Sequence, residues 1–237
     1  MNRLFALSCS LIVSTLALSG CGGNDSGSSS NDPQGQGEVQ YKLTFTTLWN
    51  AEDFPQGFPS NPHFSPLVGA THNEQTVIWR PLDQPSTTGI EQVAETGGTS
   101  LFRAELQERK TQGYVQNILL AGGGVGSPGE TVLRFRASEQ FPLLSIISMI
   151  APSPDWFVGL RDVNLREGGE WLESATFNLA LYDAGTDLGV AFTSADSDGG
   201  DGIIRLLSSD VSDTDFNNGV HRSSGLYVAT MQLQREE

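Results

Sequence analysis

The segment that decides the expected fold is Pro152 to Asp187, PSPDWFVGLRDVNLREGGEWLESATFNLALYDAGTD. It opens with a Pro-Ser-Pro-Asp-Trp turn and closes with an Asp-Ala-Gly-Thr-Asp turn. Between the turns, Ala175 to Leu181 is interpreted as a β-strand. We expect the segment to fold back on itself, so that both turns meet at one end of a β-sandwich.

The two turns carry three acids, Asp155, Asp183 and Asp187, at the ends of expected strands. Calcium takes about six to eight oxygen ligands, and loops rich in Gly, Pro and Ser can supplement carboxylates with backbone carbonyls. The pattern is therefore interpreted as one shared Ca²⁺ site. The alternative for any one of the acids is a simple turn residue, because Asp often caps its own backbone.

The composition of the 237-residue chain is typical of an exported β protein, with 38% hydrophobic residues, 17% charged residues and 27 glycines. The formal net charge of −15 excludes nucleic acid as a partner, because nucleic-acid phosphates require Lys and Arg. A strongly acidic chain is compatible with cation binding, although a solvated acidic surface also explains it.

Residues 1–20 have the pattern of a signal peptide. Arg3 precedes the apolar run Leu4 to Leu18, which is too short to span a membrane. Leu18-Ser19-Gly20-Cys21 resembles the bacterial lipoprotein box, which predicts cleavage before Cys21 and lipidation of that residue. Because Gly22 follows, and not Asp, we expect a lipid-anchored protein of the bacterial cell envelope, at the outer membrane. The alternative is an ordinary secretory signal.

Residues 21–37 are interpreted as the lipidated Cys and a flexible Gly/Ser/Asn linker, and residues 38–237 as one domain. The lipid anchor would be the only contact with the membrane. Cys9 lies in the signal peptide and Cys21 accepts the lipid, so the mature domain has no disulfide.

The rest of the chain indicates an all-β fold, a β-sandwich with long loops and one or two short helices. Val39 to Phe45 alternates apolar and polar residues, and Phe141 to Ile150 is nearly continuous apolar sequence that predicts a buried central strand. Further strands are expected at Thr76–Trp79, Thr131–Ala137, Gly189–Thr193, Ile203–Leu207 and Leu226–Leu233. Gly89 to Thr96 fits a strand or a short helix, and Ser100 to Thr111 has a helical charge pattern.

Two glycine-rich stretches have ambiguous chemistry. Gly122 to Gly129 lacks the Lys-Ser/Thr and the βαβ context of a phosphate-binding loop, so it is interpreted as a hairpin-type linker. Asp196 to Gly202 alternates Asp and Gly but lacks the EF-hand pattern. It is interpreted as a solvated loop, with a second ion site as the alternative.

Five groups of residues carry a family resemblance: Tyr41 to Phe45 with Trp49, His63 to His72, Gly89-Ile90 with Val93-Ala94-Glu95, Ser148 to Trp156, and Asp183 to Asp187. With these residues the chain resembles a spondin domain, the module of F-spondin and mindin, from about Tyr41 to Leu233. The resemblance implies a β-sandwich with a Ca²⁺ ion held by Asp155, Asp183 and Asp187. It also implies an adhesion or ligand-binding role toward an extracellular protein or glycan, without catalysis. The animal-type cysteines and thrombospondin repeats are missing here, so no animal partner is carried over.

Two other function classes stay open. Asp155 and Asp183 could be the acid and base of a glycosidase, or a metal could activate water, in a hydrolase of envelope or extracellular polysaccharide. Against this, no HExxH or Gly-x-Ser-x-Gly motif is present, and His63 and His72 are interpreted as structural imidazoles. Trp156 and Trp171 are expected in the core, with a sugar platform as the alternative. The third class is a metal-free structural envelope lipoprotein.

Overall fold

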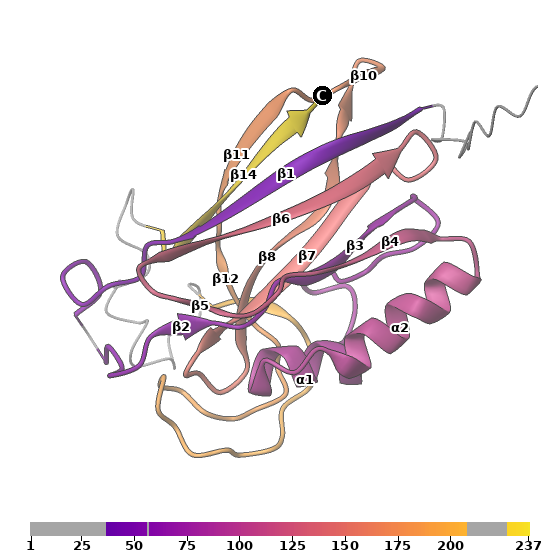
Figure 1. The fold of residues 1–237 in the computed structure, drawn as a ribbon. Helices are drawn as coiled ribbons and strands as arrows, with labels where there is room; N and C mark the ends of the chain where they lie inside the picture. Colours follow the sequence, from indigo (N-terminus) through magenta and orange to yellow (C-terminus); the bar gives the residue numbers. More distant parts are fainter. Residues whose placement is uncertain (1–36, 56, 208–226) are drawn as a thin grey trace, which may run out of the picture. The chain divides into compact units, whose positions relative to one another are not determined.

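The computed structural model describes residues 37–55, 57–207 and 227–237 (Figure 1). The predicted signal peptide, Cys21 and all but the last residue of the predicted linker lie outside these ranges. The described residues form two antiparallel sheets and two α-helices, which confirms the expected all-β sandwich with short helices.

The first sheet has four strands in the spatial order β11-β14-β1-β6. Their bounds are β1 Glu38–Thr47, β6 Gly129–Ser138, β11 Ser174–Asn178 and β14 Ala229–Glu236. β1 is an inner strand, because it pairs with β14 along one side and with β6 along the other. The N-terminal and C-terminal strands of the domain are therefore neighbours in one sheet.

The second sheet is built around β7, which pairs with β8 on one side and with β3 and β2 in succession on the other. Its strands are β2 His63–Phe64, β3 Val68–His72, β4 Val115–Leu120, β5 Val125–Gly126, β7 Leu143–Ala151, β8 Trp156–Asn164, β12 Leu181–Asp183 and β13 Arg205–Leu206. A separate short hairpin joins β9 Arg166–Glu167 to β10 Glu170–Trp171.

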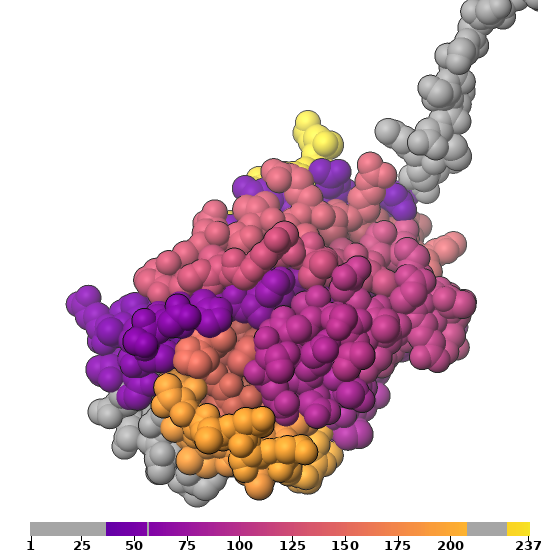
Figure 2. Space-filling view, turned by 60° about the horizontal axis from the view of Figure 1, so that its bottom comes forward, coloured from indigo at the N-terminus to yellow at the C-terminus, as the bar shows by residue number. Residues whose placement is uncertain are grey.

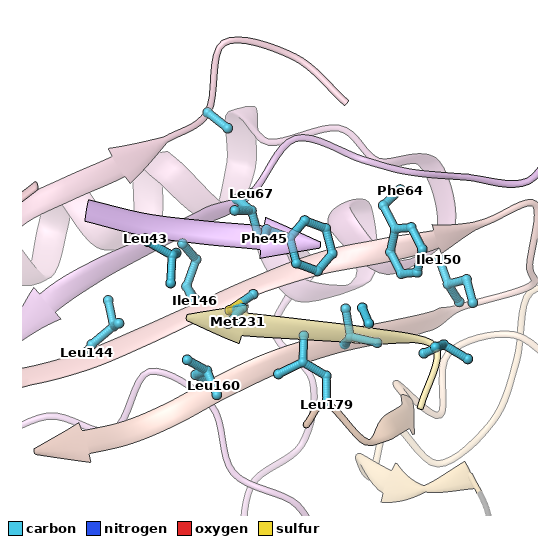
Figure 3. Packing of buried hydrophobic residues seen from close by; sticks show 14 of the residues in the cluster. Leu43, Phe45, Phe64, Leu67, Leu144, Ile146, Ile150, Leu160, Leu179 and Met231 are labelled. Carbon is cyan, nitrogen blue, oxygen red and sulfur yellow. The ribbon is translucent and has the colours of Figure 1, made fainter. Parts of the chain in front are cut away.

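The main core lies between the two sheets. Leu43 and Phe45 of β1 are fully buried, while the residues that alternate with them, Lys42, Thr44 and Thr46, are partly exposed, so one face of the strand points inward. Figure 3 shows these side chains gathered with Met231 of β14 and with Ile146 and Ile150 of β7. The apolar residues of the alternating pattern in β1 therefore lie on the face of the first sheet that packs against the second sheet.

β7 is buried along its whole length, which explains its continuous apolar sequence. Ile146 faces the main core, whereas Ile147 belongs to a second core that also contains Val93 and Phe102 of the helices. A strand covered on both faces does not need polar residues on alternate positions. The predicted buried central strand is confirmed.

Helices α1 Thr88–Thr96 and α2 Ser100–Thr111 form a layer over the outer face of the second sheet (Figure 1). The ambiguous stretch from Gly89 to Thr96 is therefore helix. No helix within the described ranges is long and apolar enough to cross a membrane.

The start of α1 is held by an acid from α2. Thr87 is the N-cap and accepts a hydrogen bond from Ile90 N at 3.3 Å. Glu105 of α2 accepts hydrogen bonds from the Thr87 hydroxyl at 2.6 Å and from Gly89 N at 2.7 Å. A carboxylate at this position satisfies an unpaired helix N–H group and stabilises the positive end of the helix dipole. Glu105 thereby fixes the angle between the two helices.

The expected strand from Ala175 to Leu181 is wrong as a single element. β11 ends at Asn178 in the first sheet, and β12 begins at Leu181 in the second sheet. Leu179 N still donates to Ala229 O of β14 at 3.0 Å before the chain crosses. Periodicity shows which residues are buried, but it does not show in which sheet a strand lies.

Two other expected strands, Thr76–Trp79 and Gly189–Thr193, are also wrong, because neither stretch forms a strand. Their apolar residues are buried for another reason. Trp79 fills the second core, and Phe192 lies in the main core. Buried side chains that anchor loops, Ile78 beside Trp79 in one stretch and Phe192 in the other, produced the apolar signal.

Replacing Glu105 by Ala is expected to lower the free energy of unfolding by about 1–3 kcal/mol, because the N-terminus of α1 loses two charge-assisted bonds. Urea unfolding followed by circular dichroism measures this loss. The control is Glu108→Ala on the exposed face of the same helix, which should change stability by less than about 0.5 kcal/mol. Equal losses in the two variants would contradict the capping role.

Candidate metal centre

The Pro-Ser-Pro-Asp-Trp turn and the Asp-Ala-Gly-Thr-Asp turn at the two ends of the Pro152–Asp187 segment meet in the structure, as expected. The first turn joins β7 to β8, and Ser153 fixes it by donating to Ile150 O at 2.6 Å and accepting from Trp156 N at 3.2 Å. β8 pairs with β12, so the second turn, which follows β12, begins beside Asp155. Ala184 N donates to Asp155 O at 3.1 Å and joins the two turns.

Asp155 lies at the centre of this contact, and its side chain is fully buried. Its Oδ2 atom accepts hydrogen bonds from Thr186 N at 2.7 Å, from Asp187 N at 3.1 Å and from the Thr186 hydroxyl at 3.3 Å. Its Oδ1 atom is buried and has no hydrogen-bond partner among the described residues. A buried oxygen without a partner is costly, because it has lost water and gained nothing in return.

Asp187 is also buried, with 7% of its surface exposed. Its Oδ1 accepts from Gly189 N at 2.6 Å and its Oδ2 accepts from Ser197 N at 2.8 Å. Asp183 accepts from Gly185 N at 2.7 Å, and Gly185 has a φ of +74°, which glycine adopts without strain. The backbone amides therefore hold both carboxylates in fixed orientations.

The other two acids affect the charge on Asp155. Burial raises the pKa of Asp155 to about 7, the carboxylate of Asp183 raises it as the second cause, and that of Asp187 contributes in the same direction. The hydrogen bonds from Thr186 and Asp187 oppose this rise in pKa, but they do not cancel it. Three acids from two turns therefore share one electrostatic environment.

The structure adds Glu95, to which the sequence assigned no role at the site. Burial raises the pKa of Glu95, and the nearby carboxylates of Glu91, Asp155 and Asp187 raise it further, while a hydrogen bond with Thr186 lowers it. Glu95 lies in the last turn of α1, where the helix dipole already disfavours a negative charge. The only sequence signal was its place in the Val93-Ala94-Glu95 group.

Figure 2 shows why a helix residue can reach the two turns. The orange loops that follow β12 lie against the magenta surface of the helices. The helix layer and the loops after β12 are therefore neighbours at this end of the domain, and α1 contributes a fourth carboxyl group.

The chemistry of these residues fits a hard cation, although the site is not preassembled. Among residues 37–55, 57–207 and 227–237, no three His, Cys, Asp or Glu side chains already stand together as a metal-binding group. The oxygens of Asp183 and Asp187 that accept amide bonds keep further lone pairs, since a carboxylate has about four acceptor sites. With the unpartnered Asp155 Oδ1, the donors are all oxygen, as Ca²⁺ prefers.

The acidic Asp196–Gly202 loop runs beside the second turn. Gly199 N donates to Thr186 O at 3.0 Å, and Gly202 N donates to Gly185 O at 2.8 Å. Within this loop, Asp201 forms an ion pair with Arg205 at 2.6 Å, and hydrogen bonds from Arg205 lower the pKa of Asp201. The loop thus packs against the candidate site, and Asp201 is engaged by a guanidinium.

The two tryptophans and the histidine that the sequence analysis considered as functional residues are packed or hydrogen bonded within the fold. Trp156 is buried in the main core, and Trp171 packs partly buried against it, with the Arg166 guanidinium 5.3 Å from the centre of its ring. His72 is fully buried and hydrogen bonds through Nε2 with the Ser145 hydroxyl at 2.8 Å. Neither tryptophan offers a free sugar platform, and His72 is the expected hydrogen-bonded imidazole. His221 lies outside the described residues.

Comparison with known proteins places these features in a family. The Spondin_N family model matches residues 39–218. Human Spondin-2 is 31% identical over 192 residues, which cover 78% of this chain and 56% of Spondin-2. Rat Spondin-2 is 33% identical over 161 residues, or 66% of this chain and 48% of that protein. Rat Spondin-1 is 30% identical over 167 residues, or 67% of this chain and 20% of that protein.

The matched region contains both turns, the β7 strand that leads into them and the α1 helix that carries Glu95. The chain spans about half the length of Spondin-2 and a fifth of the length of Spondin-1. The fold, the two turns and the extent of the match agree, and the chain belongs to the Spondin_N family.

Proposed function

We propose that this protein is an extracellular adhesion or ligand-binding module in which a structural Ca²⁺ ion, held by Asp155, Asp183 and Asp187, stiffens one end of the sandwich. The observation that carries the proposal is the fully buried Asp155, whose Oδ1 has no partner in the described part of the chain. A cation there would convert a costly buried group into a ligand. The family supports the binding role.

The electrostatic argument supports a divalent ion over a simple turn. The carboxylates of Asp183 and Asp187 repel that of Asp155, and burial makes the negative charge of Asp155 more costly. An ion would offset the repulsion and link the turn after β7 to the turn after β12. The ion would supply positive charge and cross-linking, while the chain's own backbone amides orient the carboxylates.

The anchoring of the module is part of the same proposal. Lipidation of Cys21 would attach the chain to the bacterial outer membrane, and the Gly/Ser/Asn linker would hold the domain away from it. More than one acyl chain makes such attachment stable. The ligand would be an extracellular protein or glycan.

A metal-free structural lipoprotein is the second candidate. It is favoured by the absence, within the described ranges, of three acids already gathered for an ion. A hydrolase has less support: a raised pKa suits a general acid, but Asp155 has no exposed surface with which to contact a substrate.

Calorimetry of the chain with CaCl₂ is expected to show one ion bound per chain. At a calcium concentration of about 100 times the Kd, binding should stabilise the fold by about 2.7 kcal/mol and raise the Tm by about 5–10 °C. Asp155→Asn keeps the size of the side chain but should abolish binding. The control is Asp196→Asn, which removes the same charge from the neighbouring loop. A folded wild-type chain that binds no calcium would favour the metal-free candidate.

In a chelator, the stability advantage of Asp155→Asn over the wild type should grow as the pH rises from 5 to 8. The pKa of Asp155 is raised to about 7 in the folded state from the ordinary value of 3.8 for an aspartate. The folded state therefore binds the proton more tightly, and stability falls between about pH 4 and pH 7, because over this range the unfolded chain has released the proton while the folded chain still holds it. Asn does not titrate, so the difference should reach a few kcal/mol in urea unfolding. A difference that does not change with pH would contradict the assignment.

Glu95→Gln is expected to weaken calcium binding several-fold, because the site loses a nearby negative charge, and to stabilise the metal-free chain. Glu91→Gln, one turn earlier on α1, is the matched control and should change calcium affinity less. Calorimetry and thermal unfolding with and without chelator measure both effects. If the two variants behave alike, Glu95 contributes only general charge.

A further inference from the structure

A pocket of about 400 Å³ opens at one end of the first sheet. Figure 1 shows β1 ending there, with β6 and β14 beginning beside it. The pocket lies among the residues that follow β1, the residues that precede β6 and β14, and the last residue of β11. Its volume is in the range of small-ligand and side-chain sites.

The walls of the pocket are mostly apolar. Leu48, Phe54, Pro128 and Tyr227 line it. Leu48 is 39% exposed and Tyr227 is 40% exposed, so both present apolar surface to solvent. An aliphatic chain lying across them would remove that surface from water.

The polar part of the pocket consists of Asn50, Asp53 and Asn178, and Asp53 is the one charged residue among the described residues of the lining. Asn50 donates to Asp53 Oδ2 at 2.7 Å and accepts from Asp53 N at 3.0 Å. The carboxylate is therefore held in place at the rim of an apolar cavity. Such a pairing of one fixed anion with apolar walls selects a ligand that is both cationic and partly apolar.

The backbone around the pocket is tied to the sheet. Leu48 N and Trp49 N both donate to Val228 O, at 2.8 and 3.1 Å, next to Tyr227. The Ser127 hydroxyl, beside Pro128, donates to Trp49 O at 2.7 Å. The walls from three separate segments are thus joined to one another by hydrogen bonds.

A row of aromatic rings runs from the pocket toward the candidate metal centre. The Trp49 and Phe192 ring centres are 4.7 Å apart, and those of Phe192 and Trp156 are 5.2 Å apart. Trp156 directly follows Asp155 in the chain. The pocket and the metal centre therefore belong to the same end of the sandwich and share its aromatic packing.

We propose that this pocket binds an Arg or Lys side chain of an extracellular protein segment, with the charged head on Asp53 and the aliphatic stem against Leu48 and Tyr227. This inference rests on the ligand-binding role proposed above, and it names the chemistry of the ligand. Long basic side chains lay their stems along apolar surface while the head makes an ion pair, and an aromatic ring adds a cation–π contribution.

Charge complementarity favours a basic segment over other occupants. The chain has a formal net charge of −15, and among the described residues that line the pocket none is basic. A basic partner is therefore attracted from a distance and is then positioned by Asp53. An acidic or purely apolar segment would desolvate this carboxylate without supplying a positive charge to balance it.

The test is an NMR titration of the ¹⁵N-labelled full chain with the peptide acetyl-Gly-Arg-Gly-amide. The matched peptide replaces Arg by citrulline, which has the same shape without the charge. The Arg peptide is expected to shift the amide signals of the pocket residues and to bind at least about tenfold more tightly than the citrulline peptide. Asp53→Asn should weaken binding by about tenfold, because a charge-assisted bond is lost.

The charge-matched control is Glu108→Gln, on the exposed face of α2. Equal weakening by Glu108→Gln and Asp53→Asn, or signal shifts spread over the acidic surface, would overturn the proposal, as would equal affinity for the two peptides. Sedimentation of the wild type and of Tyr227→Ala adds an independent outcome: self-association that this variant abolishes would assign the pocket to a second copy of the chain.

The titration is repeated in chelator and in calcium to separate the pocket from the ion. Arg-specific binding in both conditions supports the pocket whether or not calorimetry detects calcium. Calcium binding without Arg-specific shifts would retain the metal centre and overturn the pocket.

Discussion

The structure depends on one buried carboxylate that joins two turns. Asp155 Oδ2 accepts the backbone N–H groups of Thr186 and Asp187, which lie more than 30 residues later in the chain. This contact sets where β12 ends relative to the start of β8, and the loops after β12 are built outward from it. Because the side chain is fully buried, its protonation or ion binding is linked directly to the stability of that end.

Several features that are far apart in the sequence lie around the carboxylate of Asp155. Ser153 closes the turn before it, Gly185 allows the backbone of the second turn to reverse, and Glu95 approaches from the helix layer. Each feature positions a group relative to the same carboxylate. The helix layer therefore covers the second sheet and also brings a further negative charge to the junction, where an uncompensated cluster would be unfavourable.

Sequence reasoning found the parts of this arrangement that have a local signature. The alternating apolar and polar residues of β1 and the continuous apolar run of β7 show which faces of these strands are buried. The Pro and Gly residues near Asp155, Asp183 and Asp187 indicate turns. The crossing between β11 and β12 could not be found in this way, because the stretch around Leu179 keeps its apolar character in both sheets. The stretches around Trp79 and Phe192 were predicted as strands because buried apolar side chains on a loop give the same apolar sequence pattern as a short strand. Glu95 was missed because its importance comes from tertiary neighbours and not from its position in α1.

The pocket and the two turns lie at the same end of the sandwich but differ in their exposure to solvent. Asp155 and Asp187 are buried, so they cannot contact a partner directly, whereas Leu48, Asp53 and Tyr227 are exposed enough to do so. Without direct contact, these acids can act on a ligand through their electric field and through the rigidity of the residues around them. The rings of Trp156, Phe192 and Trp49 contact one another between the two regions. Because close-packed side chains transmit strain, a change at Asp155 can reach the pocket through these rings. A structural ion at Asp155 would then favour binding by keeping the pocket in its ligand-ready shape, which reduces the ordering cost of association.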